Sequence, residues 1–112
     1  MHLKIDYIEI ASPEIGKSRD FFATAFGWTF QDYGPEYQAM TNAGIDGGID
    51  GSPGRAGTQP LIILRADDLE AAVKSVEEAG GTIVKPVFSF PGGRRFHFRE
   101  PGGNELAVWS EN

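Results

Sequence analysis

Residues 3–27 read LKIDYIEIASPEIGKSRDFFATAFG, and this stretch decides the fold of the first half of the chain. β-Branched and aromatic side chains recur along residues 3–11, which is typical of a strand with two distinct faces. Residues 12–14 offer a serine N-cap, a proline at the first helical position and an acid near the positive end of a helix. Gly27 is placed to end that helix. Five side chains at helical spacing predict its buried face: Ile15, Ser18, Phe22, Ala25 and Phe26.

The same order of elements occurs twice along the chain. Three short β-capable runs follow the first helix, at residues 28–31, 36–41 and 45–49. Residues 50–58 are rich in glycine and have the composition of a linker. After the linker we expect a strand at 61–65 and then a helix that is capped by Asp67 and Asp68 and ends at Gly80 and Gly81. The helix should be buried through Leu69, Val73 and Val76. Three further strands are expected at 82–88, 94–99 and 105–109.

This repeat predicts an α+β fold of two paired βαβββ modules. We expect module 1 at about residues 1–50, the linker at about 51–59 and module 2 at about 60–112 of one domain, residues 1–112. Neither module alone buries both its helix stripe and its sheet at this length, so the two sheets should pair and enclose a cleft. Function should lie in that cleft.

Composition excludes several functions. The chain has 112 residues and no cysteine, so disulfides, thiol nucleophiles and thiolate metal sites are absent. A net charge of -6 and the lack of a basic cluster larger than Arg94-Arg95 argue against nucleic acid as a partner. No apolar run approaches the length of a membrane helix and the first residues are charged, so we expect a cytoplasmic protein with no membrane partner.

Strand alternation predicts which side chains face the cleft. Phe96, Phe98, Leu106 and Val108 should pack beneath a helix, which turns their neighbours to the opposite face. Six residues are therefore expected to line an apolar cleft with a few polar groups: Tyr7, Glu9, Ile63, Arg95, His97 and Trp109.

Several of these residues have a structural as well as a functional interpretation. Glu9, in mid-strand between two isoleucines, is either a ligand-binding or acid/base group, or a structural ion pair with Arg95, or exposed at a sheet edge. His97 is either a ligand or acid/base contact or a solvated strand residue. Trp28 and Trp109 are expected to serve the core or a dimer interface. Residues 91–95 form either an anion-binding turn or a simple hairpin.

Three segments carry a resemblance to a known family. They are residues 7–10 leading through 18–22 to 26–28, residues 67–71 leading to 79–81, and residues 100–104. With them the chain resembles the vicinal oxygen chelate superfamily, which includes glyoxalase I, bleomycin-resistance proteins, fosfomycin-resistance enzymes and extradiol dioxygenases. The chain departs from the family at Glu100, where an aspartate is usual.

The resemblance implies a divalent metal held by four inward-facing side chains, commonly His and Glu. By alignment these positions fall on Tyr7, Leu61, Ala107 and a residue within 46–50. Three of the four are not usual ligands, and one carboxylate cannot hold a metal without partners. We therefore expect no family-type metal site, no other cofactor, and none of the activities that use the metal as a Lewis acid.

Three functions remain open. The first is a binding protein, similar to the bleomycin-resistance branch, that takes a small molecule in the cleft without the metal. The second is a metal-independent lyase or isomerase in which Glu9 and His97 transfer protons. The third is a degenerate cleft in a domain that serves only as an interaction partner. A homodimer is also expected, because family members commonly pair and because Trp28, Phe30 and Trp109 offer apolar surface.

Overall fold

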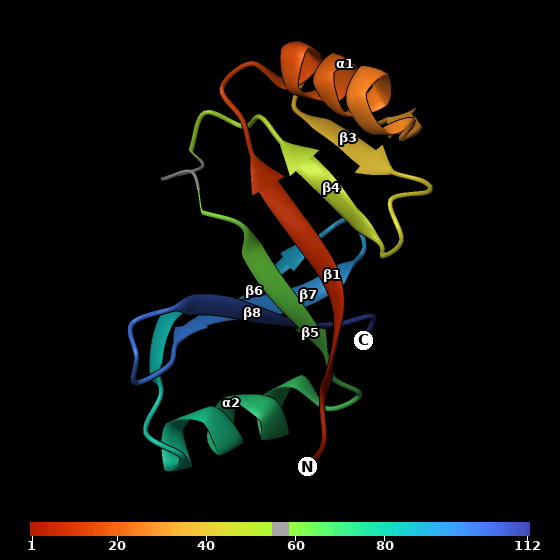
Figure 1. Cartoon of the computed structure of the whole chain (residues 1–112). Coiled ribbons are helices and arrows are strands. Elements are labelled where there is room, and N and C mark those ends of the chain that lie inside the picture. Colours follow the sequence, from red (N-terminus) through yellow and green to blue (C-terminus); the bar gives the residue numbers. More distant parts are fainter. Residues whose placement is uncertain (55–58) are drawn as a thin grey trace. The chain divides into compact units, whose positions relative to one another are not determined.

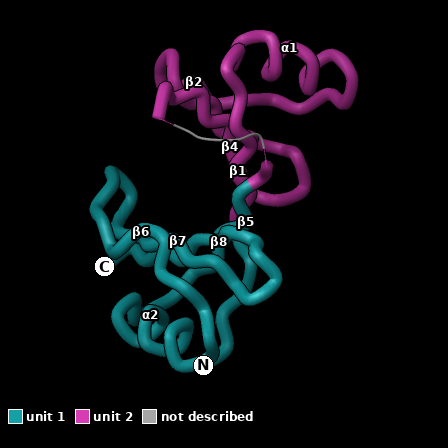
Figure 2. Tube along the Cα trace, turned by 90° about the vertical axis from the view of Figure 1, so that its left-hand side faces the viewer, with its two compact units in different colours: residues 1–6, 61–112 teal, residues 7–60 magenta. Residues whose placement is uncertain are grey.

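The computed structural model describes residues 1–54 and 59–112, so residues 55–58 of the predicted linker lie outside the described residues. The chain divides into two compact units (Figure 2). Unit 1 comprises Met1–Asp6 and Leu61–Asn112, and unit 2 comprises Tyr7–Pro60. The boundary between the units therefore falls inside the first strand, after Asp6.

Unit 2 has a four-stranded sheet and one helix (Figure 1). Its elements are β1 (Lys4–Ala11), which begins in unit 1, α1 (Ile15–Phe26), β2 (Phe30–Asp32), β3 (Tyr37–Met40) and β4 (Gly47–Asp50). The strand order is β2-β3-β4-β1. β1 runs parallel to β4 and the other pairs are antiparallel, with Glu9 of β1 level with Gly48 of β4.

Unit 1 repeats this arrangement. Its elements are β5 (Leu61–Arg65), α2 (Leu69–Glu78), β6 (Thr82–Phe90), β7 (Gly93–Arg99) and β8 (Glu105–Ser110), in the sheet order β5-β8-β7-β6. β5 runs parallel to β8, and the other two pairs are antiparallel. The predicted α+β class and the two βαβββ modules are therefore confirmed.

Helix α2 begins and packs as its sequence predicts. The Asp68 side chain accepts a hydrogen bond of 3.0 Å from the backbone N–H of Ala71 and so caps the helix. Leu69 is fully buried in a cluster with Phe96 and Val108 from the sheet beneath. The expectation that Phe96 and Val108 lie under a helix is thus confirmed, and this cluster is the core of unit 1.

Helix α1 differs from the prediction at its start and on its face. It begins at Ile15 with Glu14 as N-cap, so Pro13 lies outside the helix and no acid stands in the first turn. The Ser12 hydroxyl instead accepts a 3.1 Å hydrogen bond from the N–H of Glu14. No helix residue is fully buried: on the predicted face Ile15, Ser18 and Phe22 are half-buried, whereas Ala25 and Phe26 are exposed, so the prediction holds only in part. Gly27 does end the helix, in the left-handed region at φ 74°.

Periodicity groups side chains on one face, but burial needs a surface broad enough to cover that face. The neighbouring strands β3 and β4 have only 4 residues each. Two of those in β4 are glycines, which contribute no side chain to the contact. The apolar stripe of α1 therefore stays partly open, whereas α2 lies on the longer strands of unit 1.

The hairpin interpretation of residues 91–95 is confirmed. Phe90 pairs with Gly93 across a two-residue turn between β6 and β7. Arg94 is held by both oxygens of Glu70, at 2.7 and 3.1 Å, which ties β7 to the first turn of α2. No helix within the described part of the chain has the length and apolar character needed to span a membrane.

Candidate functional site

The six side chains predicted to line the cleft are divided between the two units. Tyr7 and Glu9 belong to unit 2, whereas Ile63, Arg95, His97 and Trp109 belong to unit 1. Each unit therefore presents its own group of candidate residues.

The register of unit 1 places its four candidates on one side of the sheet. Ile63 of β5 is level with Ala107 of β8, which is level with His97 of β7. Arg95 and Trp109 form the next pair across β7 and β8. With the neighbouring Phe88 and Glu105 these side chains make one surface, called the His97 face: Ile63, Phe88, Arg95, His97, Glu105, Ala107 and Trp109. The alternation predicted from sequence is the one the strands adopt.

His97 is the polar centre of this face. It is only 4% exposed, so the interpretation as a solvated strand residue is wrong. Its Nδ1 lies 2.9 Å from Oε2 of Glu105. Its Nε2 is also buried and has no hydrogen-bond partner among residues 1–54 and 59–112. A buried polar atom without a partner is rare and calls for an explanation.

The surroundings of His97 fix its protonation. Burial is the main cause that holds the pKa of His97 below its ordinary value of 6.5, and the positive charges of Arg95 and Lys85 act in the same direction. The hydrogen bond and negative charge of Glu105 oppose this shift. The imidazole is therefore neutral at pH 7, and its Nδ1–H donates to Glu105. Nε2 is left with a lone pair, which can accept a hydrogen bond or a proton.

Aromatic rings surround the polar groups of the His97 face. The ring of Phe88 lies 5.8 Å from that of His97, and the guanidinium of Arg95 lies 5.5 Å over both Phe88 and Phe90. Both are cation–π contacts. The face thus combines a planar apolar surface, a positive charge and a hydrogen-bond acceptor.

Trp109 is engaged within its own unit. Its Nε1–H donates to Asp6, with distances of 3.2 and 3.3 Å to the two carboxylate oxygens. The guanidinium of Arg65 lies 5.1 Å over its ring, and the ring of Phe90 lies 6.3 Å away. These contacts agree with the structural role expected for Trp109 from sequence.

In unit 2, Glu9 lies in a hydrogen-bonded chain with two tyrosines. It is 4% exposed, so the interpretation as an exposed edge residue is wrong. The hydroxyl of Tyr37 donates to Oε2 of Glu9 at 3.2 Å, and the hydroxyls of Tyr7 and Tyr37 are also hydrogen-bonded to each other. Burial, and next the negative charge of Glu9, raise the pKa of Tyr37 far above its ordinary value. Tyr37 therefore keeps its proton and donates it in the hydrogen bond to Glu9.

Gly48 makes room for this chain. A Cβ atom at position 48 would lie 2.1 Å from the Tyr37 hydroxyl oxygen and 2.3 Å from Cζ of its ring. Since any other residue would displace the ring, the glycine is what allows Tyr37 to lie beside Glu9. We call Tyr7, Glu9, Tyr37 and Gly48 the tyrosine–glutamate cluster.

The residues at the expected metal positions do not fit a metal. Leu61 and Ala107 have hydrocarbon side chains and no donor atom, and the Tyr7 hydroxyl is bonded to Tyr37. Within residues 1–54 and 59–112, no group of three or more His, Cys, Asp or Glu side chains is placed to hold a metal ion. The donor set at these positions is therefore unlike the one that the resemblance implies.

Two polar residues of these groups, Glu105 and Tyr37, were not among the candidates from the sequence. The position of Glu105 could have been predicted from strand alternation, because it lies on the same side of β8 as Ala107 and Trp109. The contact of Tyr37 with Glu9 could not have been predicted from the sequence, because it depends on the register of β3 against β4 and of β4 against β1.

Three comparisons with known proteins agree with this fold. The model of the Glyoxalase/Bleomycin resistance protein/Dioxygenase superfamily matches residues 4–108. The anthracycline biosynthesis protein DnrV of Streptomyces peucetius is 27% identical over 92% of this chain and 45% of its own length. The putative glyoxylase CFP32 of Mycobacterium tuberculosis is 24% identical over 96% of this chain and 45% of its own length.

Among solved structures, a glyoxalase/bleomycin resistance protein/dioxygenase superfamily member from Vibrio splendidus has the same fold. Its TM-score is 0.76 at 20% identity, covering 97% of this chain and 99% of that one. The fold and the family model together define the class, and the chain belongs to the glyoxalase/bleomycin resistance protein/dioxygenase superfamily. It spans about half the length of the curated relatives it matches.

Proposed function

We propose that the protein binds a small organic molecule on the His97 face, without the metal that the family resemblance implies. The observation that carries the proposal is Nε2 of His97, which is buried and without a partner in the described residues. A ligand O–H or N–H group would satisfy this acceptor. Glu105 holds the imidazole in the tautomer that this contact needs.

The chemistry of the face narrows the ligand class. Phe88 and His97 present ring surfaces, which favour a flat or aromatic molecule. Arg95 and Lys85 add positive charge near His97, which disfavours a cation. We therefore favour a neutral or acidic molecule that carries a hydroxyl group on an aromatic ring. The similarity to a protein named for anthracycline biosynthesis supports the inclusion of aromatic compounds among the ligands to test.

Replacing His97 by phenylalanine should weaken binding about tenfold or more, because the ligand loses its acceptor while the ring shape is kept. A panel of small aromatic hydroxy compounds, measured at pH 7 by saturation-transfer NMR in excess chelator, would test this. Native mass spectrometry of freshly purified protein would report any ligand that copurifies. The matched control is His2→Phe, because His2 is the other histidine of the sequence and its side chain is exposed.

Two results would contradict the proposal. One is binding that disappears when chelator is added, which would assign the contact to a metal. The other is equal affinity in the wild type, the His97→Phe variant and the His2→Phe control, which would place the ligand elsewhere.

A second candidate is the metal-independent lyase or isomerase, with His97 as the residue that transfers the proton. The pairing of His97 with Glu105 favours it, because a neutral buried imidazole oriented by a carboxylate has the form of a general base. His97→Gln should then abolish turnover of a bound compound, because a side-chain amide cannot take up the proton. Turnover that is the same in the variant would remove this candidate and leave the binding protein.

A further inference from the structure

Strand β6 contains extra residues compared with its partner β7. From Ile83 to Lys85 the chain advances by two residues, whereas the paired residues of β7 are adjacent. From Lys85 to Phe88 it advances by three residues, whereas the paired residues of β7 are two apart. Each shift marks a β-bulge, in which one strand carries an additional residue that has no direct counterpart in the other. The two bulges therefore lie on either side of Lys85.

These bulges decide which side chains of β6 lie beside His97. Residues directly opposite each other in paired strands point to the same side of a sheet. Lys85 is opposite His97 and Phe88 is opposite Arg95, so both lie on the side of the His97 face. Strict alternation after Lys85 would place Val87 there, but Val87 packs against the core beneath α2. Bulges near functional sites commonly redirect side chains in this way.

The charge of Lys85 is available to a ligand. Its side chain is exposed, and no ion pair within residues 1–54 and 59–112 includes it. Its charge still reaches the imidazole, because it acts together with burial, the main cause, to lower the pKa of His97. An ammonium group in this position can donate a charge-assisted hydrogen bond to an anionic oxygen of a ligand.

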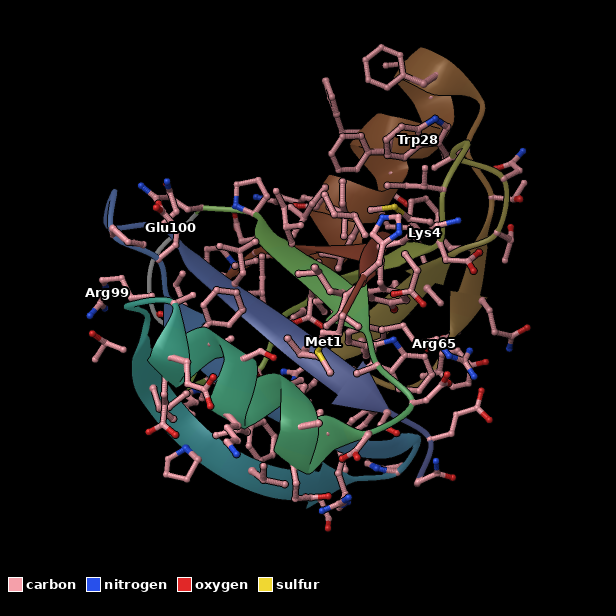
Figure 3. The ribbon with its side chains drawn as sticks, turned by 90° about the horizontal axis from the view of Figure 1, so that it is seen from below. Met1, Lys4, Trp28, Arg65, Arg99 and Glu100 are labelled. Atoms are coloured by element: carbon pink, nitrogen blue, oxygen red, sulfur yellow. The ribbon has the colours of Figure 1, made fainter. Side chains whose placement is uncertain are left out.

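Two other cations on this side of the sheet are less suited to an anionic group. The guanidinium of Arg95 lies over the rings of Phe88 and Phe90, at 5.5 Å from each, and is engaged with them. Arg99 is exposed and extends outward at the edge of unit 1 (Figure 3). Among the cations of the described residues, Lys85 is the one that pairs directly with His97 across the strands.

We propose that Lys85 is a specificity-determining residue of the His97 face, which binds an acidic group of the same ligand whose hydroxyl group donates to Nε2 of His97. The ligand class is then an aromatic hydroxy acid and not a neutral phenol. This inference rests on the proposed function, because it assigns a second polar contact to the ligand of that face. The two contacts have opposite sense, since Lys85 donates a hydrogen bond and His97 accepts one.

A protective role is the alternative for the same features. Strand β6 lies at the end of the sheet, and Pro86 follows Lys85. Lysine, proline and bulges all help to prevent an edge strand from pairing with another chain. This role does not require the ammonium group to meet a ligand. The two roles therefore differ in how the charge of a ligand affects its affinity.

Two probes of nearly the same shape separate these roles. They are meta-hydroxybenzoate, an anion at pH 7, and meta-hydroxybenzamide, which is neutral. Isothermal titration calorimetry at low salt in excess chelator should show that the wild type binds the acid about tenfold or more tightly than the amide. Lys85→Met should bring the two affinities to within about twofold of each other, mainly because binding of the acid weakens.

Two further variants control this experiment. Lys74→Met removes the same charge from α2, on the other side of the sheet, where the side chain is 79% exposed. It should keep the preference of the wild type for the acid. Lys85→Arg retains the positive charge and should keep most of that preference. Circular dichroism should show that all three variants are folded, because each changes an exposed side chain.

The possible results distinguish this inference from the proposed function. If the wild type binds both probes equally, or if Lys85→Met keeps the preference for the acid, the role of Lys85 is wrong. The proposed contact between the hydroxyl group and His97 stands in both cases. If the wild type binds neither probe at millimolar concentration, the result contradicts the proposed function together with the role of Lys85.

Discussion

Replacing Phe96 by alanine is expected to lower the free energy of unfolding by about 3–5 kcal/mol. Phe96 is 0% exposed and packs with Leu69 and Ala72 of α2 and with Val108 of β8. Its removal opens a cavity where the helix meets the sheet, and the neighbours cannot collapse fully into it. Domains of this size are typically stable by about 5–15 kcal/mol, so the loss is a large fraction of the total.

Urea denaturation followed by circular dichroism would measure this loss. Tyr33→Ala serves as the control, since the side chain is largely exposed and its removal should change the midpoint little. If Phe96→Ala cost no more than the control, the core of unit 1 would not lie where the structure places it. The effect also bears on function, because β7 carries Phe96 on one side and the adjacent His97 on the other.

The two helices show how far sequence reasoning reaches. Both have apolar side chains at helical spacing, and for α2 the predicted residues are the ones that pack against Phe96. For α1 the same kind of pattern predicted a buried face that is only half-buried at its start and is exposed at Ala25 and Phe26. The spacing of apolar residues is a local property of the chain. Whether the face they form is buried depends on the length and side chains of strands that lie elsewhere in the sequence.

The candidate residues divide in a similar way. Alternation along β7 and β8 was enough to place His97, Arg95 and Trp109 on one face, because adjacent antiparallel strands keep their sides in register. The pairing of His97 with Glu105 follows from the same pattern. The contact between Glu9 and Tyr37 could not be predicted in this way. Tyr37 reaches Glu9 across an intervening strand, and the residue at position 48 of that strand must have no side chain. This contact depends on the positions of three strands at once, so no short stretch of the sequence indicates it.

Gly48→Ala is expected to destabilise the protein by roughly 2–5 kcal/mol and to separate Tyr37 from Glu9. The added methyl group would lie 2.1 Å from the Tyr37 hydroxyl oxygen, so the ring must move. Glu9 is buried, and the displaced hydroxyl is a hydrogen-bond donor to its carboxyl group. The cost therefore combines overpacking with the weakened hydrogen bonding of a buried carboxylate. Gly16→Ala is the control, since a Cβ at position 16 of α1 meets nothing within 4 Å and alanine favours helix.

A double-mutant cycle with Tyr37→Ala separates this mechanism from a general loss of backbone freedom at position 48. If the clash with the ring is the cause, Gly48→Ala should cost little once the ring is gone, which gives an interaction energy of at least about 1 kcal/mol. Urea denaturation of the four proteins would provide the numbers. An equal cost in both backgrounds would mean that the backbone, and not Tyr37, requires glycine. Since the glycine admits the tyrosine and the tyrosine supports the carboxylate, the cycle tests whether the tyrosine–glutamate cluster acts as one unit.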